Sequence, residues 1–247
     1  MTATTGETTG AIGGPGCSAD HGSRMSDIER QPVAIEPRWP VVLVVLGFVV
    51  ITITLRILEP QRESFGPRWL VPAIEIAMLA ALVAADPARV SAGHRWLRRT
   101  AIGLVFALAL TAMMSTLLLL DALIGGGKLA GSPSSLLASG ALIWLGNLLV
   151  FSLIYWQFDT GGPLARYRHE RVYPDFAFPQ QLNPELAPPD WRPQYIDYLI
   201  LGLTTSTALS PTDVLPMARW AKLAMGLQSL VSLLVIALVI ARAVNAF

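Results

Sequence analysis

A run of hydroxylated residues near the C-terminus is the part of this chain best suited to contact an ion or a polar solute. Thr204, Thr205, Ser206 and Thr207 follow an apolar stretch, and Asp213 lies shortly before a long apolar segment. Hydroxyl and carbonyl oxygens replace the water around an ion when they line a pore. Polar main chain is tolerated at membrane depth only where protein or a water-filled cavity surrounds it. The pattern therefore predicts a sheltered polar hairpin beside the final helix.

Asp213 has two interpretations that the sequence leaves open. A carboxylate at the mouth of a pore attracts cations. An Asp that precedes a helix also stabilises the unpaired N–H groups of the first turn.

The helix after the hairpin has two distinguishable faces. At about 100° per residue, Gln228, Ser229 and Ser232 fall in one band together with small residues, while leucines occupy the other side. The polar band is typical of a tight helix-packing seam or of the lining of a pore or cavity. The aliphatic face predicts contact with lipid.

Three polar residues fall inside other apolar stretches, namely Glu75, Asp121 and Asn147. Ionisable groups within a membrane are rare enough to be functional candidates. All three are expected toward the same side of the membrane, where they could form a cluster. In one interpretation Glu75 pairs with Arg56 or Arg68 and Asn147 joins two helices; in the other they form an ion or proton site.

Residue types suited to other chemistry are scattered. Cys17 is the only cysteine, and no two histidines have metal-ligand spacing. No nucleophile can be paired with a base. We expect no catalytic residue, no enzymatic activity, no metal, no cofactor and no nucleic-acid partner.

The elements that must position these residues are membrane-spanning helices. The chain has 247 residues, of which 53% are hydrophobic and 14% charged, and the apolar residues form long unbroken blocks. This composition predicts an all-α, polytopic transmembrane helical bundle. About five spanning helices are expected, at residues 39–55, 67–85, 101–124, 136–158 and 217–246.

The stretch 196–210 is expected to be re-entrant, because about 15 residues are too few to cross a hydrocarbon core that needs about 20. A crossing by this stretch stays open as the alternative. Four regions follow: a disordered cytoplasmic tail over 1–38, a four-helix transmembrane region over 39–158, a loop rich in Pro and aromatic residues over 159–194, and the hairpin with the final helix over 195–247. We expect the loop to pack against the helix ends as a lid.

The arginines predict the orientation. The loops within 89–99 and 159–194 carry more Arg than the loops of the opposite face, and an excess of Lys and Arg marks the cytoplasmic side. The N-terminus, on the same face, is then cytoplasmic. The excess of Arg over Lys suits a bacterial protein, so we expect a multi-pass protein of the bacterial inner membrane.

The hairpin and final helix resemble the pore loop and inner helix of two-transmembrane-type potassium channels. The likeness rests on Thr204-Thr205, on the Asp213 that follows, on Pro216 and on the helix after it. It departs where the family has Gly-Tyr-Gly and this chain has Thr207-Ala208-Leu209-Ser210, so potassium selectivity is not implied. The second half is also similar to uncharacterised bacterial multi-span membrane proteins, through its Asp175–Gln180 segment, Thr212-Asp213 and Ala243–Asn245.

The resemblance implies a membrane protein of degenerate pore-loop type, either an ion-channel-like subunit or a channel accessory subunit. Its expected partners are the lipid bilayer, further copies of the chain and a monovalent cation. Thr204 to Thr207 would supply polar main chain and hydroxyls, and Asp213 would attract cations. The alternative is a non-conducting scaffold that docks a cytoplasmic partner through residues 159–194.

The expected cytoplasmic entry of the hairpin conflicts with an ordinary channel, whose filter opens to the outside. A misleading arginine count, an inverted hairpin or a relic that no longer conducts would each explain the conflict.

Overall fold

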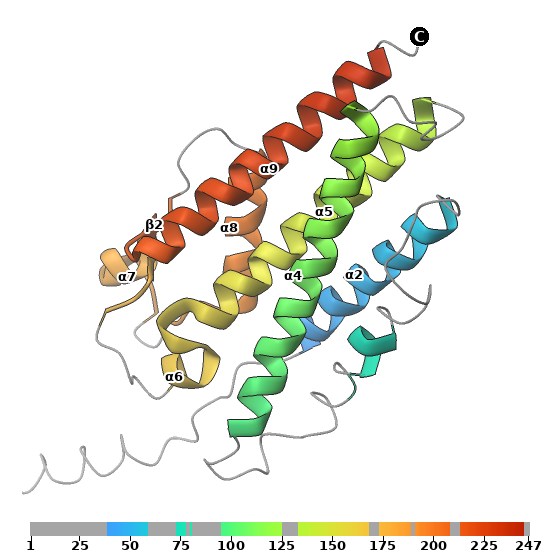
Figure 1. Cartoon of the computed structure of the whole chain (residues 1–247). Helices are drawn as coiled ribbons and strands as arrows, with labels where there is room; N and C mark the ends of the chain where they lie inside the picture. The colour runs from blue at the N-terminus through green and yellow to red at the C-terminus, as the bar shows by residue number, and fades with distance from the viewer. Residues whose placement is uncertain are drawn as a thin grey trace, which may run out of the picture. The chain divides into compact units, whose positions relative to one another are not determined.

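The computed structural model describes residues 39–58, 73–77, 80, 95–124, 133–167, 173–188, 191–207 and 213–244 (Figure 1). Its long helices are α2 (Trp39–Leu58), α4 (Arg95–Ile124), α5 (Pro133–Phe158), α8 (Tyr195–Thr207) and α9 (Arg219–Val244). The shorter elements are η1 (Asp159–Gly161), α6 (Pro163–Tyr167), β1 (Phe176–Ala177), α7 (Pro179–Leu182), η2 (Pro184–Leu186) and β2 (Leu215–Pro216). The described chain is mostly helical, as the sequence predicts.

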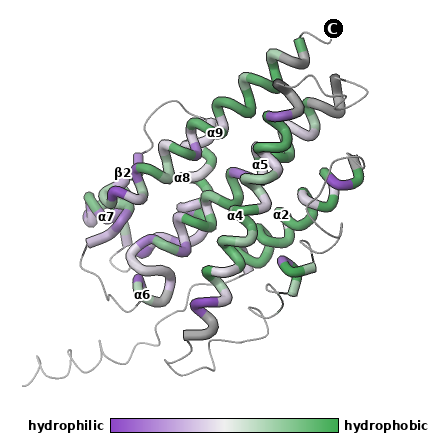
Figure 2. Tube along the Cα trace, in the orientation of Figure 1, coloured by the Kyte–Doolittle hydropathy of each residue, from purple (hydrophilic) through white to green (hydrophobic). Residues whose placement is uncertain are grey.

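In the part of the chain that the structure describes, four helices are long and apolar enough to cross a membrane: Trp39–Ile57, Arg98–Asp121, Leu137–Gly161 and Arg219–Ala241. Figure 2 shows hydrophobic residues along α2, α4, α5 and α9, and hydrophilic residues gathered around α6, α7 and β2. Such a set is typical of an integral membrane protein. The predicted span 67–85 lies largely outside the described residues, which include only a helical piece at 73–77 and residue 80. The predicted tail, 1–38, lies outside them entirely.

The helices α2, α4 and α9 run in one direction and α5 runs in the other. Near the start of α2, Val45 packs with Leu104 of α4 and with Leu153 at the C-terminal half of α5. Near the end of α2, Leu55 packs in a second cluster with Ile143, from the first half of α5. The same cluster holds Leu119 of α4 and Val239 of α9, both from the later parts of their helices. We call the end with the first cluster the Asp159 end, because Asp159 directly follows α5 there, and the other the far end.

Close helix contacts place α5 in the middle of this arrangement, where it contacts α2, α4, α8 and α9. A Cβ atom on Gly140 would lie 2.6 Å from a methyl group of Val239 on α9. A Cβ atom on Gly202 would lie 3.3 Å from Cβ of Ser152. Small residues at such points let helices approach closely when no hydrophobic effect drives their association in lipid.

The loop between α5 and α8 packs back onto the Asp159 end, as expected of a lid. Phe176 and Phe178 are buried in one cluster with Tyr155 of α5 and Tyr198 of α8. The strand β1 pairs with β2 in antiparallel register, with Phe176 opposite Pro216. The ring of Phe176 lies 5.6 Å from that of Trp220, in an edge-on arrangement that aromatic pairs prefer. The loop thereby ties the end of α5 to the start of α9.

Candidate functional site

The starts of α8 and α9 lie together at the Asp159 end, and the two helices run in parallel. Tyr198 in the first half of α8 packs on Phe178, with ring centroids 5.3 Å apart, while Trp220 at the start of α9 packs on the neighbouring Phe176. Farther along both helices, Gln228 of α9 contacts Gly202 of α8. α8 therefore starts at the Asp159 end and runs away from it, and β2 and the start of α9 lie at the Asp159 end again (Figure 1).

Gln228 holds this pair of helices together through its side-chain amide. Its Nε2 atom donates to the carbonyl oxygen of Gly202 at 2.8 Å and to Ser206 Oγ at 2.7 Å. Its Oε1 atom accepts a hydrogen bond from the Tyr155 hydroxyl of α5. Gln228 is 0% exposed, so the amide makes these bonds inside the protein, where an unpaired polar group costs about 1–3 kcal/mol.

The predicted pore-lining hydroxyls lie in the last turns of α8, in helical rather than extended main chain. The hydroxyls of Thr204, Thr205 and Thr207 donate to carbonyl oxygens of their own helix, a bond that Thr often makes within helices. Ser206 contacts Gln228 instead. Of the stretch that replaces Gly-Tyr-Gly of the channel family, Thr207 ends α8 and residues 208–210 lie outside the described residues.

The predicted faces of the final helix agree with the structure except at two positions. Gln228 and Ser232 are buried, Ser229 is half-buried and donates to the Thr205 carbonyl oxygen at 3.2 Å. The leucines of the aliphatic face are exposed, namely Leu223, Leu227, Leu230 and Leu234. Lys222 and Gly226, which the helical wheel places in the polar band, are exposed instead. Within one copy of the chain, the band is thus a helix-packing seam.

Asp213 is exposed and lies just before β2. It does not cap α9, which begins at Arg219. The N–H groups of Met217 and Ala218 donate instead to the main-chain oxygen of Asp175, at 2.8 and 3.2 Å. The capping interpretation of Asp213 is therefore wrong, because this carboxylate lies before β2 and outside the first turn of α9.

Asp159 is the polar centre of the arrangement, and sequence reasoning missed it. The side chain is 1% exposed. Its Oδ1 atom accepts from the main-chain N–H groups of Asp175 and Phe176, at 3.1 and 3.2 Å, and from the Thr160 hydroxyl at 3.0 Å. Its Oδ2 atom accepts from the Tyr198 hydroxyl. Because these donors come from α8, from the loop and from the end of α5, one carboxylate joins all three.

Arg166 and a tight turn complete this cluster. The Arg166 Nη1 atom donates to the main-chain oxygens of Trp156 and Asp159, at 2.6 and 2.9 Å, and so caps the C-terminal end of α5. Its guanidinium carbon lies 5.1 Å from the ring centroid of Tyr198, within cation–π range. Thr160, Gly161 and Gly162 all have positive φ, which the two glycines adopt without strain.

Asp197 fixes the start of α8. Its Oδ2 atom accepts from the Gln194 N–H at 2.7 Å, as the acidic member of a capping box does. Partial burial raises the pKa of this carboxyl, and the hydrogen bond from Gln194 opposes that shift. The helix thus begins at a defined residue at the Asp159 end.

The three intramembrane polar residues do not form one cluster. Asn147 donates from Nδ2 to the Thr116 hydroxyl of α4 at 2.8 Å, which is the predicted interhelical bond. Glu75 is buried, with Oε1 at 2.9 Å from the Thr111 hydroxyl oxygen. Asp121 is exposed in α4 near the far end. Arg68, one predicted partner of Glu75, lies outside the described residues.

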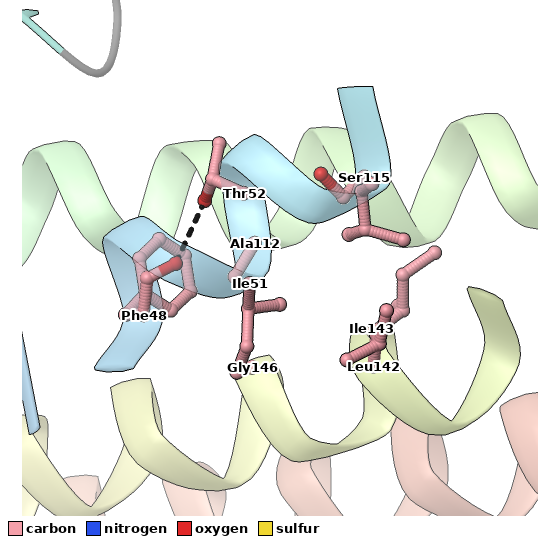
Figure 3. A pocket seen from close by; sticks show the side chains of 9 residues that line it. Phe48, Ile51, Thr52, Ala112, Ser115, Leu142, Ile143 and Gly146 are labelled. Atoms are coloured by element: carbon pink, nitrogen blue, oxygen red, sulfur yellow. Dashed lines mark hydrogen bonds between the residues drawn. The ribbon is translucent and has the colours of Figure 1, made fainter. Parts of the chain in front are cut away.

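A small pocket opens where α2, α4 and α5 meet (Figure 3). Apolar side chains such as Phe48, Ile51 and Ile143 line it. The hydroxyl of Thr52 donates to the Phe48 main-chain oxygen at 3.1 Å. Its lining contains no charged side chain, so it offers an ion no counter-charge.

The remaining chemistry gives no further candidate in the residues that the structure describes. Among them, no three His, Cys, Asp or Glu side chains gather where they could hold a metal ion. Comparisons with models of known protein families, with curated proteins and with solved structures find no match for this chain. The likeness to a pore loop therefore rests on the residues quoted above.

The missed residues had weak signals in the sequence. An Asp followed by Thr-Gly-Gly just after an aromatic helix end predicts a turn, and this signal could have identified Asp159. The roles of Tyr155, Tyr198 and Gly202 depend on contacts with segments far away in the sequence. A local sequence pattern does not predict such contacts.

Proposed function

We propose that this chain is an integral membrane protein of degenerate pore-loop type, in which α8 and the segment that follows it form a re-entrant hairpin beside α9. The observation that carries the proposal is the parallel register of the two helices from a common starting level. A chain that crossed the membrane along α8 would start its next helix at the opposite end. Here both helices start at the Asp159 end, beside β1.

The dimensions support a hairpin that dips into the bilayer and returns. α8 has 13 residues, or about 20 Å at about 1.5 Å per residue, less than the roughly 30 Å of the hydrocarbon core. Residues 208–214 reach at most about 24 Å when fully extended, which is enough to return to β2. The C-terminal end of such a half-helix carries partial negative charge at membrane depth, where it favours a cation.

The direction of the other helices supports a fifth crossing. α2 ends at the far end and α4 begins at the Asp159 end, so the chain between them returns across the same distance. Glu75 lies against Thr111, part-way along α4. We place the fifth span at residues 67–85 for this reason. The proposed cytoplasmic N-terminus rests on the excess of Lys and Arg in the loops of one face, and the proposed bacterial inner membrane rests on the excess of Arg over Lys in the whole sequence.

The hairpin makes the protein an ion-channel-like or channel accessory subunit that works as an assembly of identical chains. α9 keeps a broad exposed aliphatic face, with Leu223 at 75% and Leu227 at 55% exposed, for lipid or for neighbouring copies. Asp213, exposed at the return of the hairpin, attracts monovalent cations to its mouth.

Planar-bilayer recording of the purified protein tests this function. We expect a cation conductance that Asp213→Asn lowers, because it removes the charge at the mouth. Glu185→Gln is the matched control, since it removes an exposed acid of the same end outside the hairpin. Thr205→Val keeps the side-chain shape and removes a hydroxyl bonded to Leu201. If the wild-type protein conducts no more than the Thr205→Val and Asp213→Asn variants, the proposal that it is a channel is wrong.

Exposed apolar side chains on the loop support a second candidate, a non-conducting scaffold. Tyr173, Leu182 and Leu186 are 84%, 53% and 79% exposed, although the neighbouring phenylalanines are buried. They offer a cytoplasmic partner an apolar surface. If the protein is a scaffold, the double variant Leu182→Ser with Leu186→Ser abolishes partner binding in pull-down assays and leaves ion flux unchanged. Asp213→Asn then changes neither partner binding nor ion flux.

A further inference from the structure

Glu75 is fully buried against the middle of α4. The side chain is 0% exposed, and its neighbour Thr111 lies well inside the apolar stretch Arg98–Asp121. A carboxyl group at this depth has no bulk water to hydrate a negative charge. Its protonation state must therefore be settled by the groups around it.

A proton on the Glu75 carboxyl group lets both hydrogen bonds of the Thr111 hydroxyl form at the same time. Oε1 lies 2.9 Å from the Thr111 hydroxyl oxygen, and that oxygen lies 3.0 Å from the Ala107 main-chain oxygen. A hydroxyl has one hydrogen and can accept two bonds, so it cannot donate fully to both oxygens. If Glu75 carries a proton, it donates to Thr111, and the Thr111 hydroxyl donates to Ala107. Each of these two hydrogen bonds then has its own hydrogen, and only Oε2 is left without one.

The second carboxyl oxygen agrees with a neutral group. Oε2 is buried, and no described residue gives it a hydrogen bond. An ionised carboxylate with one oxygen unpaired in an apolar setting costs several kcal/mol, far more than a neutral acid. The positive charge of Arg56 on α2 favours the ionised form of Glu75 and opposes the larger effect of burial, and α4 contributes the uncharged Thr111.

We propose that Glu75 and Thr111 form a buried proton-binding site within the membrane, whose occupied state is the neutral acid hydrogen-bonded to Thr111. Loss of the proton reverses the bond, because the Thr111 hydroxyl then turns from the Ala107 oxygen to the carboxylate. A metal cation fits less well, since hard cations take six or more oxygen ligands and the described residues supply one carboxyl group and one hydroxyl. The site is independent of whether the hairpin conducts.

Infrared difference spectroscopy of the full chain in liposomes tests the proposal. The spectrum of the wild type minus that of Glu75→Gln isolates one carboxyl group, and Gln preserves the shape of a neutral acid. We expect the carbonyl band of a protonated carboxylic acid at neutral pH. Thr111→Val should move this band to higher frequency by removing its hydrogen-bond partner, whereas Thr111→Ser, which keeps the hydroxyl, should leave it in place. Raising the pH should replace it with carboxylate bands.

Two results would overturn the site. One is a difference spectrum at neutral pH that shows only carboxylate bands. The other is a carboxylate band that shifts when sodium replaces choline at constant pH, which would show a metal cation in place of the proton. Circular dichroism of each variant shows that its helices are intact.

Discussion

At the scale of single residues, the C-terminal hairpin is held by two buried polar groups that each join several elements. Asp159 accepts hydrogen bonds from α8, from the loop and from its own turn. Gln228 joins α5, α8 and α9. Buried polar groups that are fully paired specify one arrangement of the chain, because any displacement leaves several of them unpaired. The position of α8 is thus set by a few side chains.

Asp159→Asn should lower the free energy of unfolding by about 2–4 kcal/mol, because the amide nitrogen cannot accept from the donors that face the carboxylate. Denaturation in detergent micelles, followed by circular dichroism, measures the effect. Asp213→Asn is the control at an exposed position, with an expected change within about 0.5 kcal/mol. Equal effects of the two substitutions would show that Asp159 does not anchor α8.

Gln228→Leu should destabilise the protein by about 3 kcal/mol, since the Gly202 oxygen, Ser206 and Tyr155 all lose a buried partner. The double variant Tyr155→Phe with Gln228→Leu should be less destabilised than the sum of the two single changes, because it removes both members of one bond. Ser229→Ala, which removes the single bond from Ser229 to the Thr205 oxygen, should cost less than Gln228→Leu. Strict additivity in micelle denaturation would contradict the network.

Sequence reasoning succeeded at this scale where the local pattern determines the outcome. Helical spacing placed Gln228 and Ser232 on the protein side of the final helix, and both are buried. It did not find Asp159, because its donors at residues 175, 176 and 198 lie far along the chain. The likeness to a filter suggested sheltered main chain at Thr204 and Thr205, yet both are helical, and carbonyls one turn back satisfy their hydroxyls.

At the scale of elements, the apolar blocks predicted α2, α5 and α9 to within a few residues, because a helix buried in lipid must pair its own main chain over the whole apolar stretch. The order and direction of the helices in space depend on side-chain packing between them, which could not be predicted from the sequence. One example is the close approach of α5 and α9 at Gly140, where side-chain volume sets the distance between the helices.

Gly140→Ala should therefore destabilise the protein by about 1–3 kcal/mol, since the new methyl group would overlap the branched side chain of Val239. Adding Val239→Ala should recover much of the loss by making room. Gly226→Ala, at a position with no heavy atom within 4 Å of the added Cβ, should be neutral or stabilising by about 0.5–1 kcal/mol through helix propensity. A loss at Gly226 as large as that at Gly140 would argue against the tight contact.

At the scale of the whole molecule, the starts of α2, α4, α8 and α9 and the end of α5 all lie at the Asp159 end. The described arginines at this end include Arg98, Arg99, Arg166 and Arg192, the residues from which the cytoplasmic side of the protein is predicted. If α8 and its return are re-entrant, the loop and the mouth of the hairpin share this side, and the end of α9 lies on the other.

Thiol labelling in intact membrane vesicles tests this topology most directly. Single cysteines at Glu185, Asp213 and Val244, all exposed positions, are placed in a Cys17→Ser background and treated with a membrane-impermeant maleimide from each side. The account predicts that positions 185 and 213 react from the same side and position 244 from the opposite side. Reaction of positions 185 and 213 from opposite sides would show that α8 crosses the membrane and would contradict the re-entrant hairpin.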